Sequence, residues 1–178
     1  MTKLIILDRD GVINEDSPDF IKSPEEWRPL PGSVEAIAQL SARGYKIVVA
    51  TNQSGIARGL YDQGMLEKIH AKMLATVNAA GGSIDHIFYC PHGPQDTCDC
   101  RKPLPGLFQQ IAQFYAISLT GVQAVGDSWR DIQAAQAAGC QPVLVLTGNG
   151  KKTQQQHAQA LVDVPCFEDL AHFAHSLI

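Results

Sequence analysis

The sequence predicts an α/β fold, a mostly parallel sheet flanked by helices. Short apolar runs without polar alternation recur along the chain, which is typical of strands whose two faces are both covered. Segments with apolar residues at helical spacing separate these runs, and this alternation favours a parallel sheet. The chain has 178 residues, and at roughly 150 residues per domain we expect a single domain over 1–178.

The first half of the chain predicts three strands and two helices in alternation. The expected order is a strand over 4–7, a helix from 33 to Gly44, a strand over 45–50, a helix from Asp62 to Gly81 and a strand over 84–89. Asp62 is a suitable N-terminal cap because its side chain can accept a backbone N–H of the first turn. Gly44 and Gly81 end the two helices, as glycine commonly does.

The second half continues the alternation. We expect a helix opened by 103–105, a strand over 121–125, a helix over 131–138, a strand over 142–146 and a helix over 168–177. In the first of these helices Leu107, Ile111 and Phe114 should face the core. Residues 151–158 are polar and rich in Gln, which predicts a surface loop or a frayed helix. Together the elements predict a Rossmann-like sheet with ligands at its carboxyl edge.

Composition and charge exclude several classes of protein. The formal net charge is −4, which argues against a broad nucleic-acid-binding face. No apolar run approaches the roughly 20 residues of a membrane helix. The first apolar run stops after four residues at Asp8, too soon for the core of a signal peptide. We therefore expect a cytoplasmic protein that binds neither nucleic acid nor membrane.

Acidic and polar side chains follow three of the predicted strands. Asp8 and Asp10 follow the first strand, Thr51 and Asn52 end the second, and Asp127 follows the fourth. The carboxyl ends of parallel strands meet at one edge, so these groups should share one crevice. Asp8 and Asp10 are two residues apart and should project to the same side. Three carboxylates without a nearby His suit Mg²⁺, which prefers oxygen ligands and keeps several waters.

A second set of metal-ligating residues lies within a loop at about 90–101. Three thiols and one imidazole, from Cys90, His92, Cys98 and Cys100, crowd into eleven residues. In a reducing compartment such a set suits tetrahedral Zn²⁺ with no open position, and hence a structural ion. The spacing is tighter than in common zinc fingers. Elsewhere we expect Cys140 and Cys166 to be core thiols, and the other histidines, His70 included, to lie at the surface or at caps.

Four motifs, in order and at strand ends, resemble those of the haloacid dehalogenase-like phosphatases. They are DRDGV at 8–12, Thr51-Asn52, Lys102-Pro103 and GDSWRD at 126–131. Two segments narrow the resemblance. TNQSGIARG at 51–59 and the Cys-rich loop are similar to the D-glycero-D-manno-heptose-1,7-bisphosphate 7-phosphatase family. The related histidinol-phosphate phosphatases share the zinc loop but differ after Thr-Asn-Gln, so residues 54–59 favour the heptose branch.

The resemblance implies a Mg²⁺-dependent phosphatase that works through an aspartyl-phosphate intermediate. Asp8 would be the nucleophile, and Asp10 would protonate the leaving alkoxide and then activate water. Thr51 and Lys102 would bind the transferring phosphoryl group. Mg²⁺ would be held by Asp8, Asp127 and the backbone carbonyl of Asp10. These roles agree with the chemistry, since a carboxylate can form an acyl phosphate and a second one can serve as acid and base.

The resemblance also implies the substrate site and its occupant. The substrate would be a small phosphorylated sugar on the route to nucleotide-activated heptose, and the enzyme would be a monomer. Arg101 suits a second phosphate or sugar hydroxyls, whereas a solvated loop charge is an equal alternative for Arg58. Only 43 positions separate Asp8 from Thr51, which leaves no room for a large cap domain. The implied substrate-binding residues are Asp16, Ser17, Pro18, Asp19, Asn52, Gln53, Ser54, Arg58 and Arg101.

Three alternative functions remain at this point. Histidinol-phosphate phosphatase is the same chemistry on another substrate. A non-catalytic zinc-binding interaction module belongs to a different class and predicts no phosphate release with Mg²⁺. A DNA-end phosphatase is disfavoured by the acidic balance and by the lack of a basic, aromatic patch.

Overall fold

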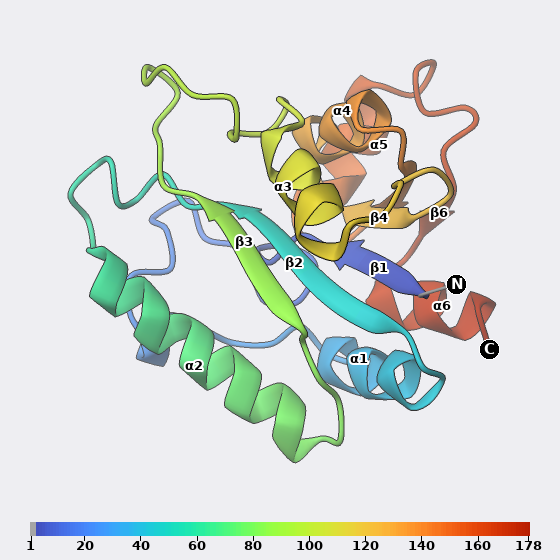
Figure 1. Ribbon diagram of the computed structural model, residues 1–178, viewed down its shortest axis with the longest axis horizontal. Coiled ribbons are helices and arrows are strands. Elements are labelled where there is room, and N and C mark those ends of the chain that lie inside the picture. Colours follow the sequence, from blue (N-terminus) through green and yellow to red (C-terminus); the bar gives the residue numbers. More distant parts are fainter. Residues whose placement is uncertain (1–2) are drawn as a thin grey trace.

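The computed structural model describes residues 3–178 and confirms the α/β fold (Figure 1). One six-stranded sheet has the order β3-β2-β1-β4-β5-β6, and all of its strand pairs are parallel. The strands are β1 (Leu4–Leu7), β2 (Lys46–Asn52), β3 (His86–Cys90), β4 (Gln123–Gly126), β5 (Gln141–Val145) and β6 (Cys166–Phe167).

Helices cover both faces of this sheet. They are α1 (Ser33–Ala42), α2 (Gln63–Ala79), α3 (Gly106–Tyr115), α4 (Trp129–Ala137), α5 (Gly150–Gln156) and α6 (Leu170–Ser176), with a short 3₁₀ helix η1 (Pro24–Glu26). Between β1 and β2 the chain adds only loops, η1 and α1. The expectation that no large cap domain interrupts the fold is therefore confirmed.

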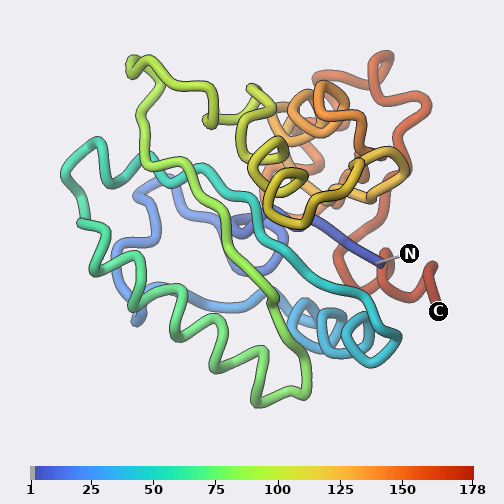
Figure 2. The backbone as a smooth tube through the Cα atoms, in the orientation of Figure 1, coloured from blue at the N-terminus to red at the C-terminus, as the bar shows by residue number. Residues whose placement is uncertain are grey.

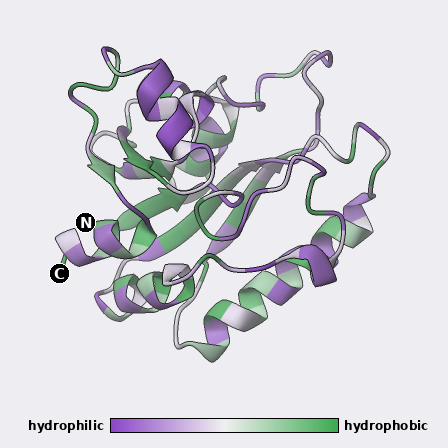
Figure 3. Cartoon of the chain, turned by 180° about the vertical axis from the view of Figure 1, so that it is seen from behind, coloured by the Kyte–Doolittle hydropathy of each residue, from purple (hydrophilic) through white to green (hydrophobic). Residues whose placement is uncertain are grey.

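The core is divided by the sheet into two apolar layers. Along β1, Ile5 and Leu7 pack with residues of α1, α2 and α6, whereas Leu4 and Ile6 pack with residues of α3 and α4. This division follows from the alternation of side chains along a strand. Hydropathy colouring shows hydrophobic strands between helices that turn hydrophilic residues outward (Figure 3). Burial on both faces explains why these strands read as continuous apolar runs.

The sheet order brings the polar strand ends together. β1 lies between β2 and β4, so the chain must cross over the sheet between β3 and β4, and α3 makes this crossing. The loop after β3 leaves the carboxyl edge of the sheet before the chain returns in α3 (Figure 2). The ends of β1, β2 and β4 thus meet at the switch point where ligands bind in open α/β sheets.

Several details differ from the sequence-based expectations. β6, only two residues long, has no counterpart among the expected strands. Of the two alternatives for the Gln-rich segment, a loop or a frayed helix, the structure has a helix over 150–156. The expectation that Phe114 faces the core is wrong, because its side chain is 59% exposed and lies 4.6 Å from the ring of His86 at the edge of the sheet. Cys140 is buried as expected, but Cys166 is exposed. Within residues 3–178, no helix combines the length and the apolar character needed to cross a membrane.

Candidate active site

One cleft opens at the carboxyl ends of β1, β2 and β4, and most of the predicted site residues line it. Pro18 and Asp19 do not; Asp19 instead faces an adjoining hollow formed by residues 15–28. The predicted residues that do line the cleft are Asp8, Asp10, Asp16, Ser17, Thr51, Asn52, Gln53, Ser54, Arg58, Arg101, Lys102 and Asp127.

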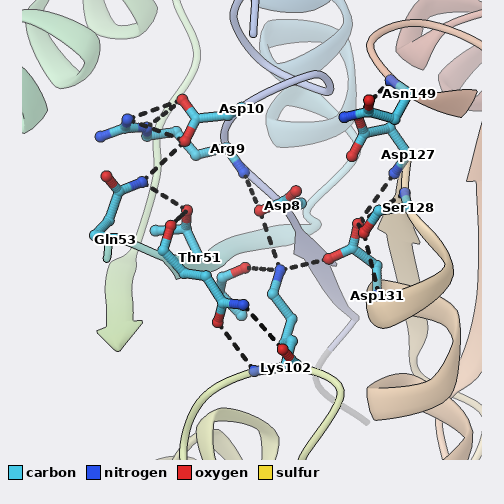
Figure 4. Close-up of polar contacts among 12 residues, drawn as sticks. Asp8, Arg9, Asp10, Thr51, Gln53, Lys102, Asp127, Ser128, Asp131 and Asn149 are labelled. Carbon is cyan, nitrogen blue, oxygen red and sulfur yellow. Dashed lines mark hydrogen bonds and ion pairs between the residues drawn. The ribbon is translucent and has the colours of Figure 1, made fainter. Parts of the chain in front are cut away.

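A buried lysine holds two carboxylates at the floor of this cleft (Figure 4). Lys102 Nζ lies 3.0 Å from Asp8 Oδ1 and 2.6 Å from Asp131 Oδ1, and it donates to the Ala50 carbonyl at 2.7 Å. Only 3% of Lys102 is exposed, so its charge is compensated almost entirely by these three oxygens. The lysine is thereby fixed beside Asp8, although 94 positions separate the two residues.

Charge and burial shift the pKa of every group in this arrangement. Burial, followed by the charge of Asp131, raises the pKa of Asp8 to about 7. Burial alone would lower the pKa of Lys102, but Asp131 and Asp8 together raise it above its ordinary value. Burial also opposes ionisation of Asp131, yet Lys102 and Ser128 bring its pKa below the usual value. The stable state is therefore a protonated Lys102 paired with an ionised Asp131.

Asp131 has little capacity left for a ligand. Its Oδ2 accepts from the backbone N–H of Asp127 at 3.2 Å and from both the N–H and the hydroxyl of Ser128, at 3.0 and 2.8 Å. The Ser128 hydroxyl in turn accepts from the Asp131 N–H, which completes a capping box at the start of α4. Asp131 therefore fixes Lys102 to the N-terminus of a helix.

Asp127 lies in a space that two glycines leave open, and Asn149 holds it there by hydrogen bonds. A Cβ at Gly11 or at Gly148 would overlap Asp127 Oδ2, and both glycines have positive φ, 83° and 54°. Asn149 donates to this oxygen from its backbone at 2.8 Å and from its side chain at 3.3 Å. Burial, then Asp131 and Asp8, raise the pKa of Asp127, so the ionised form needs a cation nearby.

The donor set of the floor fits a hard divalent cation. Carboxylate oxygens of Asp8, Asp127 and Asp131 lie within 4.8 Å of one another, and Lys102 is the one cation that pairs with them among residues 3–178. Within this part of the chain no donor bonds to Asp8 Oδ2 or Asp127 Oδ1. Two carboxylate oxygens without a donor, in a cluster of three acidic side chains, suit Mg²⁺.

The side chains that hold Asp10 differ from those that hold Asp8. Arg9 makes a forked contact with it, from Nη2 at 2.8 Å to Oδ1 and at 3.1 Å to Oδ2. Asn14 donates to Oδ1 at 2.9 Å and Gln53 donates to Oδ2 at 3.0 Å. Both Asp8 and Asp10 nevertheless line the cleft, which confirms that they project to the same side.

Thr51 and Asn52 are the last two residues of β2, and their side chains have different partners. Thr51 is 1% exposed, and its hydroxyl accepts from Gln53 Nε2 at 2.9 Å. The Asn52 amide donates to the Lys102 carbonyl at 3.0 Å and accepts from the Lys102 N–H at 3.0 Å. The side chain of Asn52 thus makes two hydrogen bonds to the backbone of Lys102. Through these bonds Asn52 positions the lysine.

Cys90, His92, Cys98 and Cys100 form a compact cluster beside the cleft, as predicted. Their ligand atoms all lie within 4.8 Å of one another. His92 Nδ1 lies 3.4 Å from both Cys90 Sγ and Cys100 Sγ. The sulfur of Cys90 is 3.9 Å from that of Cys98 and 2.7 Å from that of Cys100. At a Zn–S distance of about 2.3 Å, tetrahedral sulfur ligands would be about 3.8 Å apart, so Cys90 and Cys100 would have to separate around an ion. Burial raises the pKa of Cys90 and of Cys100, so a cation is needed to hold them as thiolates.

The fold attaches this cluster directly to the cleft. Cys90 ends β3 opposite Asn52 of β2, and the carbonyl of Cys90 accepts from the Gln53 N–H at 2.8 Å. At the other end of the loop, Cys100 is followed at once by Arg101 and Lys102. Arg101 Nη1 donates back to the His92 carbonyl at 3.3 Å. The cluster therefore sets the position of two residues that line the cleft.

Three arginines gather in the wall of the cleft: Arg58, Arg101 and Arg130. Burial, then the guanidinium of Arg130, lowers the pKa of Arg101, so these like charges feel one another. Among residues 3–178 no carboxylate lies within ion-pair distance of any of the three. A set of uncompensated guanidinium groups suits an anionic ligand.

Sequence reasoning missed several residues of the site. Arg9 and His70 meet only through the packing of α2 against β1, and the expectation of a surface or capping position for His70 is wrong because it is 7% exposed. Asn149 has no local signal, since it lies 22 positions from the Asp127 it contacts. Arg130 stands within the fourth motif, where its charge next to Asp131 was the available clue.

Comparisons with known proteins agree on one kind of enzyme. A protein-family model described as "HAD-hyrolase-like" matches residues 99–173. The D-glycero-beta-D-manno-heptose-1,7-bisphosphate 7-phosphatase of Bordetella bronchiseptica is 56% identical over 176 residues, covering 99% of this chain and 98% of the relative. The enzyme of the same name from Pseudomonas putida is also 56% identical over 176 residues, covering 99% of each.

A solved structure gives the same result in three dimensions. It is the crystal structure of D,D-heptose 1,7-bisphosphate phosphatase from B. bronchiseptica, complexed with magnesium and phosphate. The two folds agree with a TM-score of 0.94 at 55% sequence identity, covering 98% of this chain and 97% of that one.

Proposed function

The chain belongs to the D-glycero-beta-D-manno-heptose-1,7-bisphosphate 7-phosphatase family, and on that premise we propose that it hydrolyses the C7 phosphate of this heptose bisphosphate in nucleotide-heptose biosynthesis. The observation that carries the proposal is the cleft floor, where Lys102 holds Asp8 and carboxylate oxygens of Asp8 and Asp127 lie within 4.8 Å of one another. This floor fits a transferring phosphoryl group, and the three arginines beside it fit a second phosphate.

In the first step Asp8 is the nucleophile. One of its carboxylate oxygens attacks phosphorus, the bond from phosphorus to the sugar oxygen breaks, and Asp10 gives a proton to that departing oxygen. The buried ammonium of Lys102 and the hydroxyl of Thr51 stabilise the equatorial oxygens, on which the transition-state charge develops. Asp131 and Asn52 keep Lys102 in place during this step, through the contacts at 2.6 and 3.0 Å.

In the second step water attacks the phosphorus of the aspartyl phosphate. Asp10 takes the proton of this water, the bond from phosphorus to Asp8 breaks, and inorganic phosphate leaves. Mg²⁺ bound by Asp8, Asp127 and the backbone carbonyl of Asp10 would neutralise charge on the phosphoryl group. The carboxylate of Asp8 and the protonated carboxyl group of Asp10 are thereby restored for another turnover.

The remainder of the sugar bisphosphate occupies the wall of the cleft. We propose that Asp16, Ser17, Gln53 and Ser54 contact it, since all four line this wall. Pro18 and Asp19 keep only the support of the family resemblance, because they lie outside the cleft. Arg58 Nε is 3.5 Å from the hydroxyl of Ser54, and this contact supports a role for Arg58 beside the proposed substrate-binding residues.

Arg101 should affect substrate selection more than the chemical step. For Arg101→Ala we expect kcat/KM for the heptose bisphosphate to fall roughly 10- to 100-fold, as for the loss of a charged hydrogen bond. The value for 4-nitrophenyl phosphate, which lacks a second phosphate, should change by less than threefold. Steady-state kinetics with both substrates checks this, with Arg43→Ala, an exposed arginine at the end of α1, as the matched control. Equal losses on both substrates would contradict the assigned role.

A panel of phosphate esters tests the proposed substrate itself. Phosphate release is measured from the α and β anomers of the heptose 1,7-bisphosphate, from fructose 1,6-bisphosphate and from histidinol phosphate, each with and without Mg²⁺. We expect the β anomer to have the highest kcat/KM and chelation of Mg²⁺ to stop turnover. Faster hydrolysis of histidinol phosphate would overturn the assignment in favour of the alternative substrate. Absence of phosphate release from every ester would favour the non-catalytic alternative.

We also propose that the cysteine cluster holds one structural Zn²⁺. The four ligand types suit a closed tetrahedral site and their ligand atoms lie within 4.8 Å of one another, and the loop at 90–101 has few apolar residues with which to order itself. An ion there would keep Arg101 and Lys102 at the cleft. It supplies no chemistry to the reaction, since all four positions are filled by protein ligands.

Removal of one ligand should cost order in this loop. Cys98→Ser is expected to purify with less than one zinc per chain, to melt several degrees below wild type and to have a higher KM for the heptose bisphosphate. Elemental analysis, thermal unfolding and kinetics measure these effects. Cys166→Ser, which alters an exposed thiol outside the cluster, should leave all three unchanged. Wild-type protein that is fully active without zinc would refute the structural ion.

Three broader proposals complete this picture. Residues 1–178 form one domain, supported by helices that pack on both faces of a single sheet. The enzyme acts as a monomer on a small sugar substrate, as the family resemblance implies, and not on nucleic acid, since its formal net charge is −4. It works in the cytoplasm, where the thiols of the cluster stay reduced. Sedimentation velocity at micromolar concentration tests whether the enzyme is a monomer.

A further inference from the structure

A chain of buried polar contacts runs behind Asp10, away from the cleft. Its first link is Arg9, whose side chain is 0% exposed. A buried guanidinium is costly unless acceptors surround it, and Arg9 has the Asp10 carboxylate on one side. On the other side Arg9 Nη1 lies 3.1 Å from Nε2 of His70, which belongs to α2. His70 therefore completes the surroundings of the residue that grips Asp10.

The chemistry of this contact fixes the state of His70. A guanidinium can only donate, so His70 Nε2 must accept, and the ring must be neutral with its proton on Nδ1. Burial, then the charge of Arg9, lowers the pKa of His70 to about 3, which agrees with a permanently neutral ring. His70 thus serves Arg9 as an acceptor whose charge does not change in the working pH range.

A second chain of contacts reaches Asp10 through Gln53. Nε2 of Gln53 donates to Asp10 Oδ2 at 3.0 Å and to the Thr51 hydroxyl at 2.9 Å. Oε1 of Gln53 accepts from the hydroxyl of Tyr61 at 2.7 Å. Tyr61 is 8% exposed, and its ring packs against Gly55, where a Cβ would overlap it. The tyrosine hydroxyl therefore supplies the donor for Oε1 in the orientation in which Nε2 donates to Asp10.

The reverse orientation of that amide would be unfavourable. It would direct Oε1 toward the Asp10 carboxylate, and two acceptors would then repel each other. Without the Tyr61 hydroxyl, Oε1 would be a buried acceptor without its partner, and the preference between the two orientations would weaken. Asp10 would lose a donor and could turn about its side-chain bonds.

We propose that His70 and Tyr61 are positioning residues that hold the Asp10 carboxyl group at the departing oxygen, His70 through Arg9 and Tyr61 through Gln53. This inference rests on the proposed function of Asp10 as acid and base. Neither residue lines the cleft, so their effect on the reaction must pass through Arg9 and Gln53. Proton transfer is sensitive to such support, because the donor must lie within hydrogen-bond reach of the leaving oxygen.

A series of aryl phosphates separates this role from a general loss of structure. An acidic phenol such as 4-nitrophenol departs without a proton, whereas unsubstituted phenol departs faster when Asp10 protonates it. With enzyme in excess over substrate, the rate of phenol release in a single turnover reports the first step alone. The variants are Tyr61→Phe, His70→Leu and His70→Gln, in which the amide oxygen can replace the acceptor at Nε2. Tyr115→Phe, at the end of α3 and outside the cleft, is the matched control.

We expect Tyr61→Phe and His70→Leu to slow release from phenyl phosphate about tenfold, a part of the 10²- to 10⁴-fold that acid–base catalysis supplies. Release from 4-nitrophenyl phosphate should change less than twofold, so the dependence of rate on leaving-group pKa becomes steeper. His70→Gln should recover most of the rate on phenyl phosphate. KM of Tyr61→Phe should stay near wild type.

Other outcomes would overturn the inference. Equal losses on both esters, or no loss on either, would show that the two residues do not act on proton transfer. A His70→Gln variant as slow as His70→Leu would refute the acceptor role of the ring. The aryl series does not depend on the natural substrate: a wild type that turns over these esters but not the heptose bisphosphate would refute the proposed function and leave this test decisive.

Discussion

Asp8→Asn should abolish phosphate release from the heptose bisphosphate while the fold survives. The amide that replaces the carboxylate is a poor nucleophile, and the change also removes a charge that faces Asp127 across the cleft floor. We expect kcat to fall by about 10⁴-fold or more, as when other covalent nucleophiles are removed. Steady-state phosphate release with excess Mg²⁺ measures the loss. Trapping with acid should recover phosphorylated protein from the wild type and none from the variant.

The same substitution should change how stability depends on pH. Burial and the charge of Asp131 raise the pKa of Asp8 to about 7, whereas in the unfolded chain it is about 3.9. Between these values the folded wild type binds more protons than the unfolded chain, so its stability falls as the pH rises. The Asn variant lacks this contribution. In metal-free buffer its melting temperature should therefore decrease less than that of wild type between about pH 4 and pH 7.

A surface aspartate provides the control for both measurements. Asp163→Asn, at an exposed position in the loop before β6, should match wild type in turnover and in the pH dependence of melting. Turnover by Asp8→Asn within tenfold of wild type would exclude the covalent mechanism through this residue. A variant whose melting temperature follows the wild-type pH curve would show that folding does not raise the pKa of Asp8.

Lys102→Met should lose both activity and stability. The methionine fills much of the same space but leaves Asp8 and Asp131 buried without the cation that lies 3.0 and 2.6 Å from them. Breaking one side of a buried ion pair typically costs about 3–5 kcal/mol. Because Lys102 also faces the transferring phosphoryl group, we expect kcat/KM to fall roughly 10²- to 10³-fold, and to similar extents for the sugar bisphosphate and for 4-nitrophenyl phosphate.

The loss of stability should depend on pH in a defined direction. In the wild type, Lys102 counteracts the effect of burial and lowers the pKa of Asp131. Without Lys102, burial dominates, both carboxyl groups take up protons more readily, and the variant becomes less stable as the pH rises. The difference from wild type in urea unfolding should thus be larger at pH 8 than at pH 5. Lys151→Met, at an exposed position on α5, should show neither effect, and a pH-independent loss would contradict this account.

Local features of the sequence predict most of the fold and the chemistry of the site. The apolar runs that end at Asp8, Thr51 and Asp127 identify strands and place polar groups at their carboxyl ends, because a strand buried on both faces has no need of alternation. Cys98 and Cys100 lie close to Cys90 along the chain, so a few turns of loop suffice to gather the metal ligands. Such signals depend on a residue's near neighbours, and the structure confirms them.

The errors occurred where side chains meet across the fold. Phe114 has helical spacing with Leu107 and Ile111, but α3 lies near the edge of the sheet and leaves this ring exposed. His70 reads as an ordinary polar residue on a helix, and no neighbour in sequence indicates that it would be buried. Spacing predicts which face of an element a residue occupies, whereas the packing of whole elements decides how far that face is covered.

The sequence by itself determined the α/β fold, the carboxylates at the strand ends and the ligands of the cysteine cluster, because each follows from spacing within a few residues. Tertiary structure alone decided that Lys102 pairs with Asp131, that Asn149 holds Asp127, and that Arg9 is buried against His70. These contacts join residues 22 to 61 positions apart, or elements that meet only at the switch point. These contacts depend on the order of the strands in the sheet and on their register. Patterns within a few residues of the sequence do not predict either of these.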